Sequence, residues 1–253
     1  MKKQELLFYE AYEAFYEMTG KSETFHKFCA EAFGEDFSQD GFSDVNQVNR
    51  ILPYIPEGEN VHVLDIGCGN GKMLGYLQKQ TGVFISGFDY AEAAIRKARA
   101  ILPERSEFKV GVIGETEYPS EYFDVVISMD TMYFARDMSA FVWQVKRWLK
   151  PDGVCFVGYQ EGDVIPKTQN AHITQLAQAF RANKMDYQTI DITYETYLLL
   201  KNKRRAACIY QDEFLREGHG EWFDMLMGQT ECVNEPFEGF KQKMARYIYI
   251  AHS

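Results

Sequence analysis

A short run of glycines directly follows an apolar, strand-like segment, and these residues could hold a ligand. Gly67, Gly69 and Gly71 alternate with other residues after the segment 61–66. Glycine lets the backbone approach a ligand closely and takes a positive φ without a steric penalty. The carboxyl ends of parallel strands are where open α/β sheets bind ligands. This junction therefore predicts a site for a nucleotide-like ligand.

Two aspartates near the glycines narrow the type of ligand. Asp65 precedes the run, and Asp89 ends the next apolar segment about twenty residues downstream, a combination that dinucleotide-binding folds share. The spacing differs, however, because the dinucleotide pattern G-x-G-x-x-G requires glycine where this chain has Lys72. A carboxylate at Asp65 would also repel a pyrophosphate. The residues favour an ammonium-bearing ligand, while Asp89 could alternatively cap the helix that follows it.

The elements that must position these residues alternate between strand and helix patterns. We expect strands at 61–66, 83–88, 108–112, 123–128, 154–159, 187–192 and 246–251. We expect helices between them at 72–80, 91–101, 138–149 and 169–184, with a turn at 150–153. Alternation of this kind is typical of a parallel sheet covered by helices.

Two aromatic-rich helical segments are added to this alternation. Residues 5–33 show the spacing of two helices, and a short helix from Asp44 to Leu52 should stop at Pro53. The block 194–240 is too long to be a loop. We divide the chain into a helical cap, 1–45, and a main domain, 46–253, with a helical insertion at 194–240, and we expect all three to fold onto one core. The rings of the cap either pack on the main domain or close over a ligand.

Composition excludes several classes of protein. The 253 residues are 46% hydrophobic, enough for a large core, and the net charge of −10 disfavours nucleic acid as a partner. The basic cluster from Lys201 to Arg205 is typical of a solvated helix face. Five scattered cysteines indicate neither disulfides nor a zinc site, so we expect no metal. No apolar stretch reaches bilayer length, and the first residues do not resemble a signal peptide. We therefore expect a cytoplasmic protein without membrane insertion.

Several separate motifs together resemble the class I S-adenosylmethionine-dependent methyltransferases, especially the branch that acts on small molecules. These motifs are Val63-Leu64-Asp65-Ile66-Gly67-Cys68-Gly69-Asn70-Gly71, Asp89 after Ile85-Ser86-Gly87-Phe88, Tyr122-Phe123-Asp124-Val125-Val126, and Trp148-Leu149-Lys150-Pro151-Asp152-Gly153. They span roughly residues 61–160. The resemblance implies a Rossmann-like fold: a mostly parallel seven-stranded sheet with an antiparallel last strand and helices on both faces.

The resemblance also implies S-adenosyl-L-methionine as the cofactor and a set of residues that bind it. Asp65 would meet the ammonium of the methionine part, directly or through water, and Asp89 would accept hydrogen bonds from the two ribose hydroxyls. Gly111-Val112 stand where the family often has an acidic residue, so adenine would be read by backbone or by Glu115. The full set of implied cofactor-binding residues is Asp65, Gly67, Cys68, Gly69, Asn70, Asp89, Tyr90, Ile113, Gly114, Glu115 and Met129.

Methyl transfer from a sulfonium needs alignment and dehydration more than an obligatory catalytic side chain. The segment 128–134 follows the fourth strand, beside the expected sulfonium, and lacks the prolines of the Asn/Asp-Pro-Pro-aromatic motif found in enzymes that methylate base amines. Asp130 could accept a proton or hold a cationic amine, and Tyr133 could contact the acceptor; alternatively, Asp130 caps the turn and Tyr133 packs. Weaker candidates are Tyr159, Gln160 and His172.

These features lead us to expect a methyltransferase for a small-molecule amine or hydroxyl. In this family the two helical additions would lie over the sheet edge that binds the cofactor, so we expect them to form a lid that encloses the acceptor and excludes water. A non-catalytic S-adenosylmethionine-binding sensor and an NAD-dependent oxidoreductase remain as alternatives. The sequence specifies neither the acceptor nor the oligomeric state.

Overall fold

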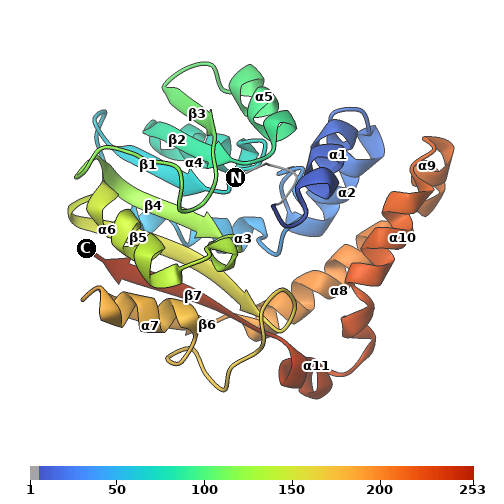
Figure 1. Ribbon diagram of the computed structural model, residues 1–253. Helices are drawn as coiled ribbons and strands as arrows, with labels where there is room; N and C mark the ends of the chain where they lie inside the picture. The colour runs from blue at the N-terminus through green and yellow to red at the C-terminus, as the bar shows by residue number, and fades with distance from the viewer. Residues whose placement is uncertain (1–5) are drawn as a thin grey trace.

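The computed structural model describes residues 6–253 and contains one seven-stranded sheet (Figure 1). The strand order is β3-β2-β1-β4-β5-β7-β6. The strands are β1 (His62–Ile66), β2 (Phe84–Asp89), β3 (Ser106–Val110), β4 (Phe123–Met129), β5 (Leu149–Glu161), β6 (Asp186–Asp191) and β7 (Ala245–His252). β7 runs antiparallel between β5 and β6, and the pairs among β1 to β5 are parallel. The predicted Rossmann-like fold with an antiparallel last strand is confirmed.

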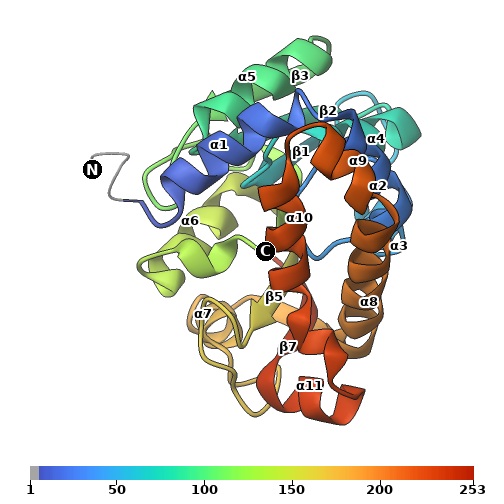
Figure 2. The same cartoon turned by 90° about the vertical axis from the view of Figure 1, so that its right-hand side faces the viewer.

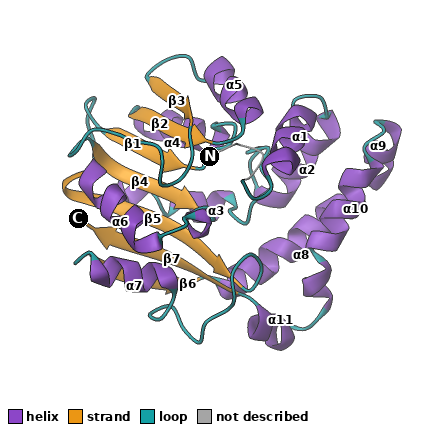
Figure 3. Ribbon diagram, in the orientation of Figure 1, coloured by secondary structure: helices purple, strands orange, loops and turns teal. Residues whose placement is uncertain are grey.

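Helices surround the sheet on both faces and at one edge (Figure 3). The α-helices are α1 (Tyr9–Thr19), α2 (Glu23–Phe33), α3 (Val45–Asn49), α4 (Lys72–Thr81), α5 (Glu92–Ile101), α6 (Met138–Trp148), α7 (Gln175–Ala182), α8 (Thr193–Ile209), α9 (Gln211–Arg216), α10 (Gly220–Gln229) and α11 (Phe237–Lys243). Short 3₁₀ turns are η2 (Leu52–Tyr54), η3 (Met132–Phe134) and η4 (Glu231–Asn234).

Each face of the sheet has its own apolar core. On one face, α6 and α7 cover a cluster that includes the wholly buried Trp148 and Phe180. On the other, α3, α4 and α5 cover a cluster that includes Leu74 and Ile95. Because both faces are covered, the central strands are buried on both sides, which explains their nearly continuous apolar sequences.

A third apolar cluster joins the N-terminal helices to the insertion. It contains Phe15 and Phe28 from the cap, Ala94 from α5, and Phe214 and Leu226 from the insertion. Figure 2 shows α1 and α2 beside α8, α9 and α10. The two additions, far apart in sequence, therefore share a core beyond the carboxyl edge of the parallel strands (Figure 1).

Some element boundaries differ from those that the pattern predicts. The helix expected at 169–184 begins only at Gln175, because the side chain of Thr174 accepts a hydrogen bond from the Ala177 amide and caps it. The turn expected at 150–153 lies within β5, which starts at Leu149. Pro53, expected to end a helix, lies within the 3₁₀ turn η2, where its missing N–H costs nothing. The third strand lies two residues earlier than expected.

Candidate cofactor and acceptor site

The glycine turn between β1 and α4 has the backbone that only glycine adopts easily. Gly67, Gly69 and Gly71 have φ values of 73°, 53° and 76°. A Cβ at Gly67 would lie 2.5 Å from Cγ2 of Thr131, and one at Gly69 would collide with the Tyr16 hydroxyl. The turn therefore excludes side chains at two positions, and it brings β1 against the segment after β4 and against α1.

Asp89, at the end of β2, connects the glycine turn to α5. Its Oδ2 accepts a hydrogen bond from the Gly69 amide at 3.0 Å, and its Oδ1 accepts one from the Ala91 amide at 2.9 Å. Burial raises the pKa of Asp89 to about 6, although these amides act in the opposite direction. The carboxylate acts as a local cap, and it retains lone pairs that further donors could use.

Asp65, at the end of β1, is the least satisfied acid in this region. Its side chain is 2% exposed, and Oδ1 has no hydrogen-bond partner among the residues that the structure describes. Burial, with the nearby charge of Asp89, raises the pKa of Asp65 well above its ordinary value. Asp65 lines a cavity of about 50 Å³ whose other walls include Tyr16, Gly67 and Met129. A buried acceptor without a donor, lining a cavity beside the glycine turn, fits the ammonium of the expected cofactor.

Cys68 and Asn70 lie between the glycines and line the same cavity. The Asn70 amide donates to the carbonyl oxygens of Phe37 and Ser38, at 3.2 and 3.0 Å, and its Oδ1 accepts from the Lys72 amide. In this structure Asn70 therefore fastens the end of the N-terminal segment to the glycine turn.

The residues expected around adenine and ribose lie on the far side of Asp89. The Tyr90 hydroxyl donates to the Leu7 carbonyl, and the Tyr90 ring contacts Tyr12. Ile113 packs against one face of the sheet core, while Gly114, with φ 83°, has open space around its Cβ position. Glu115 is exposed. None of these residues has a contact that identifies adenine.

Asp130, the first candidate for acceptor chemistry, is held by a buried arginine. Arg246 on β7 donates from Nε to Oδ1 of Asp130 at 2.9 Å and from Nη2 to Oδ2 at 2.7 Å. The remaining donors reach the Ser43 hydroxyl, the Phe42 carbonyl and the Gln47 side chain. Both Asp130 oxygens are thus paired, and its backbone has a positive φ of 60°. This arrangement favours a role in shaping the turn over a role as a free proton acceptor.

Arg246 was missing from the sequence-derived candidates. The sequence did contain a signal for it, because Arg246 is a lone charged residue at the start of an otherwise apolar strand. In the structure Arg246 is 0% exposed. A fully buried arginine requires a carboxylate partner. The identity of that partner is set by the sheet, which places β7 beside β5.

Tyr133, the second candidate, contacts the rings of Phe134 and Tyr159. Burial, followed by the charge of Asp130, raises the pKa of Tyr133 well above its ordinary value, so the phenol stays protonated. Among the weaker candidates, the Tyr159 hydroxyl and Gln160 Oε1 are buried without partners in the described chain. His172 lies on the surface near Tyr187, 3.4 Å from its hydroxyl.

Helix α1 brings aromatic rings to this edge of the sheet. Tyr16 lines the cavity and stacks on Tyr12, and Phe8 meets Phe134 edge to face. Burial raises the pKa of Tyr12, and the carboxylates of Asp40, Asp89, Asp130 and Asp163 raise it further, so Tyr12 lies in an acidic environment. Tyr12 and Tyr16 belong to the aromatic pattern of the sequence, but nothing in that pattern specifies which rings face the cavity.

Residues 6–253 contain no group of three or more His, Cys, Asp or Glu side chains arranged to hold a metal ion. No helix in the same range is long and apolar enough to cross a membrane.

Comparison with known sequences places this geometry in a family. A family model described as "Methyltransferase domain" matches residues 64–157, from β1 to β5. Phosphoethanolamine N-methyltransferase 1 of Arabidopsis thaliana is 34% identical over 235 residues, which are 85% of this chain and 47% of that protein. Sterol 24-C-methyltransferase of Gibberella zeae is 26% identical over 140 residues, 53% of this chain and 36% of that protein. The chain thus spans less than half the length of these relatives.

Solved structures share the fold over nearly the whole chain. Phosphoethanolamine N-methyltransferase 2 of Haemonchus contortus superposes with a TM-score of 0.75 at 18% identity, covering 95% of this chain and 59% of that one. A cyclopropane synthase from Mycobacterium tuberculosis gives a TM-score of 0.75 at 14% identity, covering 98% and 99%. The matched domain, the confirmed sheet and the glycine turn together identify residues 64–157 as a methyltransferase domain and support the class I S-adenosylmethionine-dependent family.

Proposed function

We propose that this chain transfers a methyl group from S-adenosyl-L-methionine to a small-molecule acceptor, and that the accepting group is an amine or a hydroxyl. The unpaired, buried Oδ1 of Asp65, facing a cavity beside the glycine turn, is the observation that carries the proposal. A buried acid that lacks a donor is costly unless a ligand supplies one. When bound, the cofactor supplies a methyl group on a positively charged sulfur, which an electron pair of the acceptor can displace.

The side chains have separate tasks in this proposal. Asp65 accepts hydrogen bonds from the ammonium, and Asp89 accepts them from the ribose hydroxyls while it holds Gly69. Gly67 and Gly69 let Thr131 and Tyr16 pack against the turn, and their backbone lines the cavity where the methionine part would bind. α1, with Tyr16 above the cavity, excludes water from the reacting groups.

An amine is the acceptor that the surroundings of Tyr12 favour. The Tyr12 ring stacks on Tyr16 and meets Tyr90 edge to face, and a group of aromatic rings suits a cationic amine. The similar Arabidopsis thaliana enzyme is named for an amine, phosphoethanolamine. A hydroxyl acceptor would need a general base, and the paired Asp130 is poorly placed to act as one.

The test combines calorimetry with S-adenosylmethionine and a methyl-transfer assay against a panel of small amines and alcohols. Asp89→Ala should weaken cofactor binding at least about 100-fold, because it removes two hydrogen bonds to a charged acceptor, each worth about 1.5–3 kcal/mol. Asp137→Ala is the matched control: Asp137 also caps a helix, through the Ala140 amide, and it does not line the cavity. The control should bind the cofactor as the wild type does.

The alternatives predict different results. Cofactor binding without a methylated product from any acceptor would favour a sensor or partner protein. Tight binding of NAD without binding of S-adenosylmethionine would refute the proposal. Wild-type cofactor affinity in Asp89→Ala would refute only the assignment of Asp89 to the ribose. The cytoplasmic location and the absence of a nucleic-acid partner stay predictions.

A further inference from the structure

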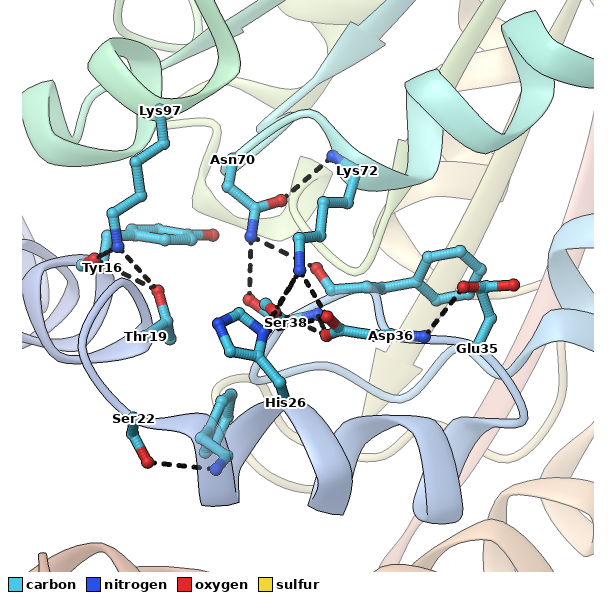
Figure 4. Close-up of polar contacts among 12 residues, drawn as sticks. Tyr16, Thr19, Ser22, His26, Glu35, Asp36, Ser38, Asn70, Lys72 and Lys97 are labelled. Carbon is cyan, nitrogen blue, oxygen red and sulfur yellow. Dashed lines mark hydrogen bonds and ion pairs between the residues drawn. The ribbon is translucent and has the colours of Figure 1, made fainter. Parts of the chain in front are cut away.

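A polar cluster outside the cavity connects the glycine turn to the N-terminal segment (Figure 4). Lys72, the first residue of α4, donates from Nζ to Asp36 Oδ2 at 2.5 Å and to Ser38 Oγ at 2.7 Å. His26 on α2 completes the cluster, with Nδ1 2.9 Å from Asp36 Oδ2 and 2.8 Å from Ser38 Oγ. The methionine-binding role expected of the turn does not use these four side chains, since none of them lines the cavity.

The segment 36–39 has two sides with different tasks. Asp36 and Ser38 point to Lys72, whereas Phe37 and Gln39, which alternate with them, line the cavity beside Asp65 and the glycines. Because the two pairs of side chains belong to neighbouring residues of one short segment, holding Asp36 and Ser38 also positions Phe37 and Gln39. Ser38 has a positive φ of 44°, a conformation that a non-glycine residue keeps only when its surroundings hold it.

The segment is fastened to the glycine turn from two directions. Asn70 donates to the carbonyls of Phe37 and Ser38, and Lys72 binds the side chains on the opposite side. Burial acts to raise the pKa of Asp36, but the hydrogen bonds from Lys72 and the Ser38 hydroxyl, with the charge of Lys72, lower it overall and favour the carboxylate form. The side chains of Lys72 and Asp36 are 26% and 27% exposed, which leaves part of their attraction unscreened.

We propose that Lys72 is a positioning residue for the cofactor: by holding Asp36 and Ser38, it fixes Phe37 and Gln39 in the wall of the cavity that Asp65 also lines. The inference rests on the proposed function and adds a residue that acts through others, because the Lys72 ammonium points away from the cavity toward Asp36 (Figure 4). Loss of the ammonium would release one side of the wall while the Asn70 contacts keep the other.

The experiment uses the full chain and three variants. Lys72→Met removes the ammonium and keeps the aliphatic stem, and Lys72→Arg retains a cation. Lys27→Met is the matched control, because Lys27 makes a comparable ion pair of 2.7 Å with Glu213, far from the cavity. Each protein is titrated with S-adenosylhomocysteine by calorimetry, and hydrogen exchange is followed at residues 36–43 without ligand.

Lys72→Met should bind S-adenosylhomocysteine roughly 2- to 30-fold more weakly, the range seen when residues act on a site through others. Exchange at residues 36–43 should be faster, and at saturating cofactor kcat and the KM for the acceptor should stay unchanged. Lys72→Arg should recover most of the affinity, and Lys27→Met should match the wild type in every measurement.

Two outcomes would overturn the inference. One is wild-type affinity and exchange in Lys72→Met; the other is an equal loss in cofactor affinity, acceptor KM and kcat, which a general structural role would produce. If the wild-type protein itself bound no S-adenosylhomocysteine, the proposed function would fail together with the inference. Normal binding by both wild type and Lys72→Met contradicts the inference alone.

Discussion

The buried ion pair between Arg246 and Asp130 provides the sharpest test of how this fold is held together. Arg246 is wholly inaccessible to solvent, and the side chain of Asp130 is 7% exposed. The guanidinium joins β7 to the end of β4 and, through Ser43 and Gln47, to the segment that leads into β1. Replacing Arg246 with Met keeps a chain of similar length but leaves the Asp130 carboxylate buried without a cation.

The expected cost follows from that uncompensated charge. Breaking a buried pair from one side costs about 3–5 kcal/mol. For a chain of this size each kcal/mol lowers Tm by about 2–4 °C, so Arg246→Met should melt roughly 6–20 °C below the wild type. The double variant Arg246→Met/Asp130→Asn should recover a large part of the loss, because the amide of Asn carries no charge.

Chemical denaturation and thermal melting monitored by circular dichroism measure both effects. Arg205→Met is the control, because Arg205 pairs with Glu31 on an exposed helix surface, where such pairs contribute about 0–1 kcal/mol. The reasoning would be refuted if Arg246→Met lost less than about 1 kcal/mol. It would also be refuted if the double variant were as unstable as the single one.

Three further predictions concern the glycine conformations and the acids Asp89 and Asp65. Gly82 has a φ of 73° and open space around its Cβ position, so Gly82→Ala should lower the free energy of unfolding by about 1–2 kcal/mol. Gly67 has the same φ but lies against Thr131, so Gly67→Ala should cost roughly 1–3 kcal/mol more and abolish cofactor binding. Equal losses of the two variants in denaturant melts would contradict the contact with Thr131. Because the pKa of Asp89 is about 6, cofactor affinity measured by calorimetry should fall up to about tenfold per unit as pH drops below 6, since the protonated acid loses an acceptor. Binding of the cofactor ammonium should lower the raised pKa of Asp65 and release up to about one proton at neutral pH, detected as a dependence of the binding enthalpy on the buffer; no release would contradict the Asp65 assignment.

Local patterns in the sequence were sufficient to predict the sheet and the glycine turn. The alternation of apolar strands and amphipathic helices depends on residues a few positions apart, and burial of both faces of the sheet leaves that period in the sequence. The positive φ values of Gly67, Gly69 and Gly71 follow from the same local requirement. The predicted end of a helix was wrong where a capping side chain fixes it, as Thr174 does at the start of α7.

The sequence by itself therefore determined the sheet, the methyltransferase motifs and the glycine turn after β1. Only the tertiary structure decided which distant residues contact one another: Arg246 with Asp130, Lys72 with Asp36, and Tyr16 with Gly69. These pairs come from strands and helices that are far apart in the chain, and their contacts depend on strand order and on how the cap packs against the insertion. The hydrophobic period of a strand or a helix, two or about 3.6 residues, carries no information about contacts between residues that are far apart in the sequence.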